Sequence, residues 1–345
     1  MTRPTLDEVY LARQRVSAFV RRTPQFPSAW LTGACGADVH LKLESLQVTH
    51  SFKVRGAFNA IAAVSASAGA DVSVVTASAG NHGVALAYAA RIARVPITIF
   101  TSAHAPATKL RAIAQHGATL HAVATDYDDA ERRALAHAAE HGSTYVSPYN
   151  RPDVIAGAGT VALEVIDDLP DVDTIVVPVG GGGLLSGVAL AAKGVRPGVR
   201  VVGVEAASNP VFARSLAAGA ITHVDVLPTI ADGLSGNLEP GSVTFEMVRD
   251  LVDEVVAVSE EELRAAIRGL AAWEHLIAEG AGVPAVAALM SGRVDVGGRR
   301  TVAIVSGANI DVGRLAEVLA EGCLPVLQRA EQRRRAGGDD VRGEP

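Results

Sequence analysis

The sequence predicts an α/β protein with two lobes, each an open, mostly parallel twisted sheet flanked by helices. Short β-branched runs alternate with longer amphipathic segments along the chain, and this alternation is typical of β–α–β crossovers. The chain has 345 residues, of which 49% are hydrophobic, so it can bury two cores. No repeat with a period of roughly 20–50 residues is present, which excludes a solenoid or a propeller.

The individual elements follow from local patterns taken in chain order. Thr5 and Glu8 form a Thr-x-x-Glu capping pattern ahead of apolar residues at helical spacing, which predicts a first helix. The same spacing predicts the later helices, and short runs rich in Val and Ile predict the strands. The expected helices are 5–20, 55–65, 83–92, 107–116, 128–141, 158–169, 184–193, 260–271 and 282–290. The expected strands are 39–43, 72–76, 97–100, 120–123, 145–146, 174–179, 199–204, 255–258 and 301–305.

The chain is expected to cross between the lobes in the segment 147–153, which carries two prolines. We expect residues 1–68 and 151–328 to form the larger lobe and residues 69–150 to form a smaller, mobile lobe. The segment 329–345 is rich in arginine and lacks apolar periodicity, so a disordered, solvated tail is expected there.

Composition excludes several classes of partner. The net charge is −6, with acids and bases interspersed over the body of the chain, so no nucleic-acid partner is expected. The two cysteines, Cys35 and Cys323, cannot build a disulfide framework or a four-ligand zinc site, and they suit a reducing cytosol. The N-terminus has no apolar signal core, and no long uncharged apolar stretch predicts a membrane span.

A glycine run follows one of the expected strands. The β-branched run Thr174–Val179 leads into four consecutive glycines, Gly180–Gly183, and a helix-like segment begins at Leu184. Glycines there let backbone N–H groups approach a ligand, and the helix N-terminus adds free donors and partial positive charge. The pattern predicts an anion site, most often for phosphate. The alternative is a tight turn without a ligand.

The kind of phosphate ligand can be narrowed. No GxxxxGK[ST] motif follows the glycines, so they do not form a nucleoside triphosphate loop. A GxGxxG fingerprint is met only loosely, and Glu205, the nearest acid on a following strand, would be a weak ribose ligand. A phosphate on a smaller cofactor fits better.

A lysine in the first part of the chain supplies a second clue. Lys53 follows Ser51 and Phe52 at the start of an expected helix. A lysine beside an apolar ring loses part of its hydration, its pKa falls, and its free amine can attack a carbonyl. A phosphate site plus such a lysine suggests pyridoxal phosphate, whose aldehyde forms a Schiff base with lysine. Alone, the lysine would be read as a surface residue.

The segment Lys42–Asn59, KLESLQVTHSFKVRGAFN, resembles the cofactor-lysine segment of the threonine dehydratase and serine racemase family. Those proteins are fold-type II pyridoxal phosphate enzymes with a tryptophan synthase β-like fold. The resemblance runs from Thr5 to Leu327, nearly the whole chain. Further motifs follow in the family's order, namely SAGNH at 78–82, VIAGAGT at 154–160, VPVGGGG at 177–183, TIADG at 229–233, EGAG at 279–282 and VSGANID at 305–311.

The resemblance implies a role for each matching residue. Lys53 would be the Schiff-base lysine and the base that removes the Cα proton. The implied cofactor-binding residues are Phe52 against the ring, Asn81 at the 3-hydroxyl, Ser306 at the pyridine nitrogen, Gly233 and Glu279 along the cofactor face, and Gly180, Gly181, Gly182, Gly183 with the Leu184 N–H around the phosphate. The implied substrate-carboxylate loop, which uses backbone donors at a helix start, consists of Ser78, Ala79, Gly80, Asn81 and His82.

The implied reaction follows from Ser306. A hydroxyl supplies no charge, so it cannot hold a pyridinium as an aspartate would, and prompt loss of a β-leaving group suits such a site. We expect a lyase that performs α,β-elimination on L-threonine or L-serine and yields a 2-oxo acid and ammonia. The resemblance also suggests a homodimer. The chain ends soon after Ser306, which suggests a catabolic type without a regulatory domain.

Three positions depart from the family pattern. His50 stands where a glycine is usual, so it caps or packs locally, contacts the substrate or gates its entry. Ala79 stands where serine racemases carry a second serine as acid and base, which disfavours racemisation. Val211 stands near the position of a second metal-binding acid after Glu205, so no metal is expected, because a hard cation needs several oxygens.

Several alternatives stay open on the sequence alone. The substrate could be another β-hydroxy amino acid, such as 3-hydroxyaspartate or phenylserine, or the protein could be a serine racemase. A catalytically silent binding protein is opposed by the presence of Lys53, Asn81 and Ser306. A nucleotide-dependent oxidoreductase is opposed by the missing fingerprint. Fold resemblance alone does not establish which function applies.

Overall fold

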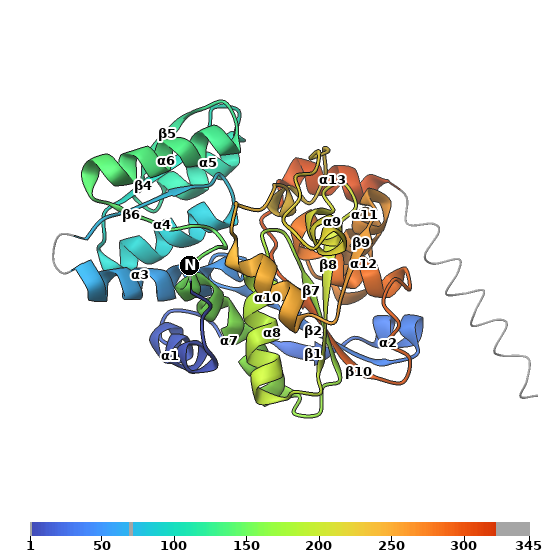
Figure 1. Ribbon diagram of the computed structural model, residues 1–345. Helices are drawn as coiled ribbons and strands as arrows, with labels where there is room; N and C mark the ends of the chain where they lie inside the picture. Colours follow the sequence, from blue (N-terminus) through green and yellow to red (C-terminus); the bar gives the residue numbers. More distant parts are fainter. Residues whose placement is uncertain (1, 69–71, 322–345) are drawn as a thin grey trace, which may run out of the picture.

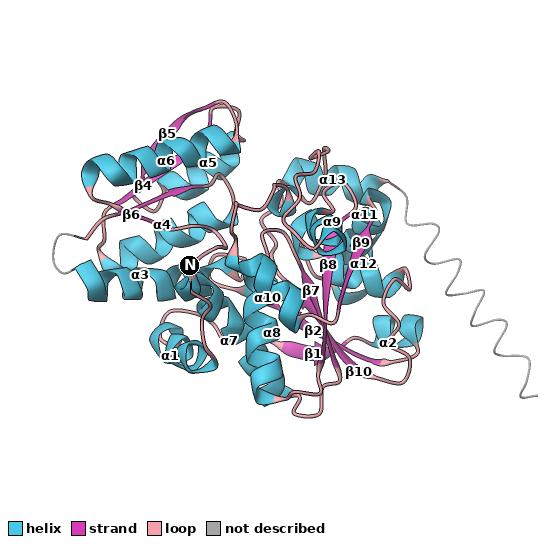
Figure 2. Ribbon diagram, viewed as in Figure 1, coloured by secondary structure: helices cyan, strands magenta, loops and turns pink. Residues whose placement is uncertain are grey.

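The computed structural model describes residues 2–68 and 72–321 and contains two sheets (Figures 1 and 2). The larger sheet contains β1 (Gln25–Pro27), β2 (Asp38–Leu43), β7 (Thr174–Pro178), β8 (Arg200–Ala206), β9 (Glu254–Val258) and β10 (Arg300–Val305). The smaller sheet contains β3 (Val74–Ala77), β4 (Ile97–Ser102), β5 (Thr119–Ala124) and β6 (Thr144–Tyr145).

The strand orders are β1-β2-β10-β7-β8-β9 and β5-β4-β3-β6. Every neighbouring pair is parallel except β1 and β2. The predicted α/β class with two mostly parallel sheets is therefore confirmed. The expected tail, 329–345, lies outside the described residues.

Helices cover both sheets. The α-helices are α1 (Leu6–Val16), α2 (Ala29–Cys35), α3 (Lys53–Ala68), α4 (Asn81–Ala93), α5 (Ala107–Ala114), α6 (Tyr127–His141), α7 (Pro152–Asp168), α8 (Gly183–Val195), α9 (Val211–Ala218), α10 (Val243–Leu251), α11 (Glu260–Gly269), α12 (Pro284–Met290) and α13 (Val312–Ala320). Short turns are η1 (Glu44–Leu46), η3 (Asp232–Leu234), the π-helical η4 (Leu270–Glu274) and η5 (Gly280–Gly282).

The six-stranded sheet and its helices form the large lobe. In the central strand β10, Val302 and Ile304 face a core cluster shared with α1, α7 and α8, whereas Ala303 and Val305 face a second cluster shared with α2, α11 and α12. Because successive strand residues point to opposite faces, both sides of β10 are buried. This explains why its sequence reads as a continuous apolar run.

The four-stranded sheet with α4, α5 and α6 forms the small lobe. Phe100 and Ala134 belong to the cluster between the sheet and α6, while Ile99 and Leu86 belong to the cluster on the opposite face. Helix α3 adds Ile61 and other apolar side chains to that second cluster and also packs against α7. Figure 1 shows α3 and α4 on the opposite side of this sheet from α6.

Several boundaries differ from the sequence-based expectations. The Thr5–Glu8 capping box is confirmed. Helices α3, α4 and α7 begin earlier than expected, at Lys53, Asn81 and Pro152. Strand β1 and helices α2, α9, α10 and α13 were not predicted, because they are short or lack a long periodic pattern. The expected helix 260–271 changes to π-helical geometry at Leu270.

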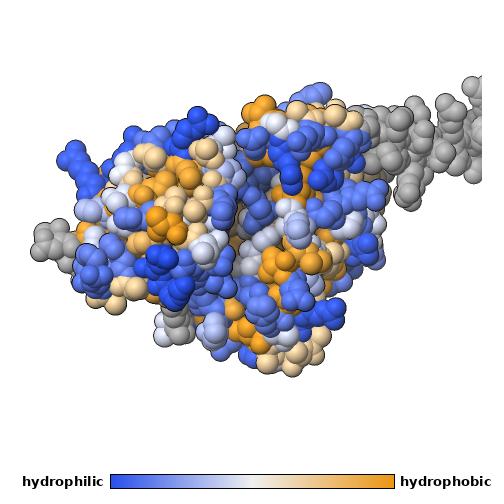
Figure 3. Space-filling view, turned by 90° about the horizontal axis from the view of Figure 1, so that it is seen from above, coloured by the Kyte–Doolittle hydropathy of each residue, from blue (hydrophilic) through white to orange (hydrophobic). Residues whose placement is uncertain are grey.

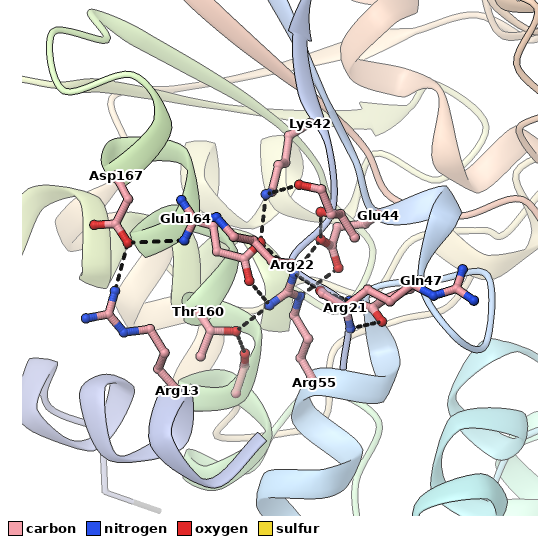
Figure 4. A network of polar contacts seen from close by, with 12 residues as sticks. Arg13, Arg21, Arg22, Lys42, Glu44, Gln47, Arg55, Thr160, Glu164 and Asp167 are labelled. Atoms are coloured by element: carbon pink, nitrogen blue, oxygen red, sulfur yellow. Dashed lines mark hydrogen bonds and ion pairs between the residues drawn. The ribbon is translucent and has the colours of Figure 1, made fainter. Parts of the chain in front are cut away.

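A buried cluster of charged side chains joins helix α3 to helix α7 (Figure 4). Arg55 Nε lies 2.7 Å from Glu44 Oε2, and its Nη1 lies 2.7 Å from Glu164 Oε1. Lys42 Nζ lies 2.7 Å from Glu164 Oε2. Burial alone would lower the pKa of Arg55, but the two carboxylates raise it above its ordinary value. Two cations and two anions therefore balance inside the protein and fix α3 against α7.

Replacing Arg55 by methionine should destabilise the fold strongly. The change leaves the buried Glu44 without a cation and Glu164 with Lys42 alone. Removing one partner of a buried ion pair typically costs ~3–5 kcal/mol. Chemical denaturation of the cofactor-free protein measures the loss. A matched control is Arg132→Met, because Arg132 pairs with Asp129 on α6 but its side chain is 69% exposed, so less than about 1 kcal/mol is expected. Equal effects of the two substitutions would contradict the structural role of the cluster.

Candidate active site

Lys53 is held at the carboxyl end of the large sheet. The Phe52 N–H donates to the Ser306 carbonyl at 3.1 Å, and Ser51 forms an antiparallel bridge with Gly307. Ser306 follows directly after β10. In open parallel sheets, ligands bind at this edge, outside the carboxyl ends of the strands. The lysine segment therefore lies where such a site is expected.

The ammonium group of Lys53 is turned inward. Its Nζ donates to the Pro148 carbonyl at 2.8 Å and lies 5.1 Å from the centre of the Phe52 ring. Burial lowers the pKa of Lys53 to about 8. A usable fraction of the amine is thus uncharged near neutral pH, which a nucleophile or a base requires.

The glycine run forms the turn between β7 and α8. Gly182 is the N-cap of α8 and has φ 87°, a conformation that favours glycine. A Cβ added at Gly181 would lie 2.4 Å from the Tyr149 ring, so a side chain would displace that wall. Within the described part of the chain, the N–H groups of residues 181–184 have no hydrogen-bond acceptor. Free donors at the positive end of a helix fit a phosphate group.

Asn81 and Glu279 meet from opposite lobes. Asn81 Nδ2 donates to Glu279 Oε1 at 2.6 Å, and Asn309 Nδ2 donates to Asn81 Oδ1 at 2.7 Å. Burial raises the pKa of Glu279 to about 7, and the hydrogen bond from Asn81 opposes that rise. Asn309 lies inside the 305–311 motif but was not singled out from the sequence, because its role depends on contacts with residues far along the chain.

Ser306 and Gly233 lie on neighbouring parts of the large lobe. Ser306 Oγ donates to the Ala281 carbonyl at 3.2 Å. A Cβ on Gly233 would lie 3.0 Å from Ala281 Cβ, and one on Gly180 would lie 2.9 Å from Leu234 Cα. The turn η3 therefore lies between the Ser306 region and the glycine run. The assigned cofactor roles of Ser306 and Gly233 stay predictions.

The SAGNH loop begins helix α4. Ser78 Oγ accepts hydrogen bonds from the N–H groups of Gly80 and Gly83. His82 is buried, and its Nε2 donates to the Val146 carbonyl at 3.2 Å. Burial, with a smaller contribution from Lys53, lowers the pKa of His82 to about 3, so its ring is neutral. The His82 side chain therefore points into the protein, and its ring is not a cationic partner for a carboxylate at this loop.

The positions that depart from the family pattern fit their local surroundings. His50 is exposed and has φ 57°, which explains why glycine is common there. Its carbonyl accepts from the Ala308 N–H at 2.9 Å. A substrate contact of the His50 ring stays a prediction, as does the substrate-facing role of Ala79.

Glu205 acts as a helix cap. Its two oxygens accept from the Phe212 and Ala213 N–H groups at 3.0 Å each, at the start of α9. Burial raises the pKa of Glu205 to about 7 despite these two hydrogen bonds. Among the described residues, no group of three or more His, Cys, Asp or Glu side chains could hold a metal ion.

The segment between β6 and α7 supplies parts of the site that the sequence analysis did not assign. Besides the Pro148 carbonyl, Tyr149 packs on the glycine run and its hydroxyl accepts from the Glu239 N–H at 2.8 Å. Ser147 and Asn150 donate to the Glu239 carboxylate. The composition of the segment predicted only a crossing, because these contacts come from residue 239.

The two lobes face each other across a hollow in the surface, visible in Figure 3. An ion pair between Lys109 on α5 and Asp232 on η3 spans from one lobe to the other. No helix in the described ranges has the length and apolarity to cross a membrane.

Comparison with known proteins identifies the family. Residues 16–307 match the family described as pyridoxal-phosphate dependent enzyme. The chain belongs to this family. L-threonine ammonia-lyase of Thermotoga maritima is 42% identical over 92% of this chain and 79% of its own length. L-threonine dehydratase catabolic TdcB of Escherichia coli is 36% identical over 91% of this chain and 95% of its own.

Solved structures agree with the fold. Maize serine racemase has a TM-score of 0.85 and 33% identity, with 93% of this chain and 99% of that chain covered. A threonine deaminase from Solanum lycopersicum has a TM-score of 0.84 and 30% identity, with 93% and 96% covered. The family membership and the fold-type II architecture predicted from the sequence are confirmed, and with them the pyridoxal phosphate cofactor.

The residues present fit that cofactor. The turn 180–183 leaves no space for side chains and presents unpaired N–H groups, as a phosphate requires. Lys53 has a lowered pKa, as a lysine that attacks an aldehyde requires. Which residues hold which part of the cofactor remains a prediction.

Changing Gly181 to aspartate should weaken cofactor binding by at least about tenfold, or ~1.4 kcal/mol. The new Cβ collides with Tyr149, and the new charge repels phosphate at a helix N-terminus. Equilibrium dialysis with pyridoxal phosphate measures the change. Gly33→Asp is the matched control, because a Cβ there meets nothing within 4 Å. Unchanged binding by Gly181→Asp would remove the glycine run from the phosphate site.

Covalent capture of pyridoxal phosphate by the cofactor-free protein should depend on pH. Only the uncharged Lys53 amine attacks the aldehyde, and its pKa is about 8. The capture rate should rise about tenfold per pH unit below that value and level off above it. Stopped-flow absorbance measures this profile. A midpoint near 10.5, the ordinary lysine value, would show that the buried amine is not the reacting group.

Proposed function

We propose that this protein is a pyridoxal phosphate-dependent ammonia-lyase that converts L-threonine, and L-serine as a second substrate, to a 2-oxo acid and ammonia. The observation that supports this most is its 36–42% identity, over more than nine-tenths of the chain, to an L-threonine ammonia-lyase and an L-threonine dehydratase. The expected lyase of the threonine dehydratase type is confirmed by these relatives. The hydroxyl of Ser306 in place of an acid is consistent with elimination.

Each part of the site has a task in this proposal. When bound, the cofactor supplies the electron sink that makes the substrate Cα proton acidic. Lys53 Nζ accepts that proton, and its lowered pKa makes it an effective base. Backbone donors of residues 78–82 hold the substrate carboxylate at the start of α4. The N–H groups of residues 181–184 hold the phosphate.

We further propose that the segment 69–150 moves as the smaller lobe and closes over the substrate. Its carboxylate loop lies on the small lobe, while Gly180–Gly183 and Ser306 lie on the large lobe, so closure would complete the site and exclude water. The link between Lys109 and Asp232 is partly exposed, with 29% and 57% of the two side chains accessible, and is easily opened. A small-angle scattering profile unchanged by a bound substrate analogue would contradict this movement. A homodimer and a cytoplasmic location are part of the proposal, and light scattering tests the dimer.

The test of the function is ammonia release. L-Threonine, L-serine, 3-hydroxyaspartate and 3-phenylserine are compared with the wild-type holoenzyme, and threonine should be turned over best. Lys53→Ala should lose this activity, since it removes the base and the cofactor-linking amine together. Lys193→Ala is the control, because Lys193 pairs with Asp253 at the far end of α8. Turnover by Lys53→Ala within about tenfold of wild type would refute the assignment.

Racemisation provides the contrasting outcome. It requires a proton donor on each face of Cα, and the resemblance places Ala79 where serine racemases carry a serine. A positioned acid is worth about 10²–10⁴-fold, so wild type should form little D-isomer, and Ala79→Ser should raise its yield. Chiral chromatography of the amino acid left after partial turnover measures both. If wild type forms D-serine as fast as ammonia, the protein is a racemase with another second base.

A further inference from the structure

Asn309 joins three segments that surround the cofactor site. It follows β10 and is the central residue of a tight turn in which the Ile310 N–H donates to the Ala308 carbonyl at 2.8 Å. Its Nδ2 donates to the Thr49 carbonyl at 3.0 Å and to Asn81 Oδ1 at 2.7 Å. These contacts connect the large-lobe strand β10, the Lys53 segment and the small-lobe helix α4.

The chemistry of these partners fixes the orientation of two amide groups. The Thr49 carbonyl can only accept, so the nitrogen of Asn309, not its oxygen, faces it. That same nitrogen contacts Asn81, so the Asn81 atom at this contact is the oxygen. The Asn81 nitrogen must then face the other way, where the Glu279 carboxyl oxygen lies at 2.6 Å. A backbone carbonyl thus determines the direction of the Asn81 amide through one intermediate side chain.

We propose that Asn309 is a positioning residue that keeps the NH₂ group of Asn81 directed toward the cofactor. This inference rests on the proposed function and on the role that the family resemblance implies for Asn81, as the donor to the 3-oxygen of the pyridine ring. The Asn81 nitrogen carries two hydrogens, and Glu279 takes one of them. The second remains for the cofactor oxygen. If the Asn81 amide were flipped, its carbonyl oxygen, which is an acceptor, would face the cofactor oxygen in place of the NH₂ donor.

Glu279 alone cannot secure this orientation. Burial raises the pKa of Glu279 to about 7, so this carboxyl carries a proton part of the time near neutral pH. A protonated carboxyl can donate to an amide oxygen, and it then tolerates either direction of Asn81. The Thr49 carbonyl accepts hydrogen bonds at every pH, so the Asn309 nitrogen always faces it. That nitrogen in turn always requires the oxygen of Asn81 on its other side. Asn309 is therefore the partner that keeps the NH₂ group of Asn81, and not its oxygen, directed away from Asn309.

A double-mutant cycle tests the proposal. Equilibrium dialysis gives the Kd of pyridoxal phosphate for wild type, Asn309→Ala, Asn81→Ala and the double variant. Asn309→Ala should raise the Kd about tenfold, the usual value of one such hydrogen bond. The double variant should bind no more weakly than Asn81→Ala if the Asn309 side chain affects the cofactor through Asn81, as proposed. A Kd within twofold of wild type for Asn309→Ala, or additive losses in the double variant, would overturn the proposal.

The absorption spectrum of the bound cofactor provides a second measurement. Asn309→Ala should shift the long-wavelength band, because the 3-oxygen loses its donor, whereas a merely structural change would leave the band in place. Asn59→Ala is the matched control, since the Asn59 amide likewise donates to a backbone carbonyl, that of Asp153. An equal shift in the control, or no shift in Asn309→Ala, would contradict the proposal.

Failure to fold and failure of the proposed function can both be recognised. Thermal unfolding of the cofactor-free variants detects a loss of fold, in which case Asn309→Ser, which keeps a small polar side chain, replaces Asn309→Ala in the cycle with the same expected results. Wild type that binds pyridoxal phosphate but releases no ammonia would refute the lyase and leave the cycle interpretable. If the double-mutant cycle gives one of the contradicting results while wild type releases ammonia normally, only the role of Asn309 is refuted.

Discussion

The buried pairing of Arg55 with Glu44 and Glu164 is the constraint on which the geometry of the site depends. It fixes α3 against α7, and their backbones approach so closely that a Cβ at Gly157 would lie 2.7 Å from Gly56 Cα. Helix α3 begins with Lys53, and α7 follows shortly after the Pro148 carbonyl that accepts from Lys53. One packed helix pair therefore positions both the amine and its acceptor.

Polar contacts between the lobes involve the same residues as the site. Asn81 comes from the small lobe, and its amide is held between Glu279 and Asn309 of the large lobe. The segment after β6 is fixed to the large lobe through Glu239. The acceptor of Lys53 and the partners of Asn81 thus lie at the junction, so that the relative placement of the lobes and the local hydrogen bonding are linked.

Much of the fold was predictable, because long periodic segments and β-branched runs report burial directly. The position of the glycine turn between β7 and α8 was predictable, because four consecutive glycines separate a β-branched run from a helical pattern. Its role as the phosphate site stays a prediction. The Pro148 carbonyl, Tyr149 and Asn309 were not predictable, because their roles arise from backbone atoms or distant partners. Short α2, α9, α10 and α13 also lacked a sufficient pattern.

The left-handed backbone of His50 has an energetic consequence. A residue with a Cβ typically loses about 1–2 kcal/mol in that conformation relative to one without, and the loop is held there by the bond between its carbonyl and the Ala308 N–H. The strain is stored three residues before Lys53, in the segment that also provides the Thr49 carbonyl. Packing elsewhere in the protein must therefore offset the energetic cost of this conformation at His50.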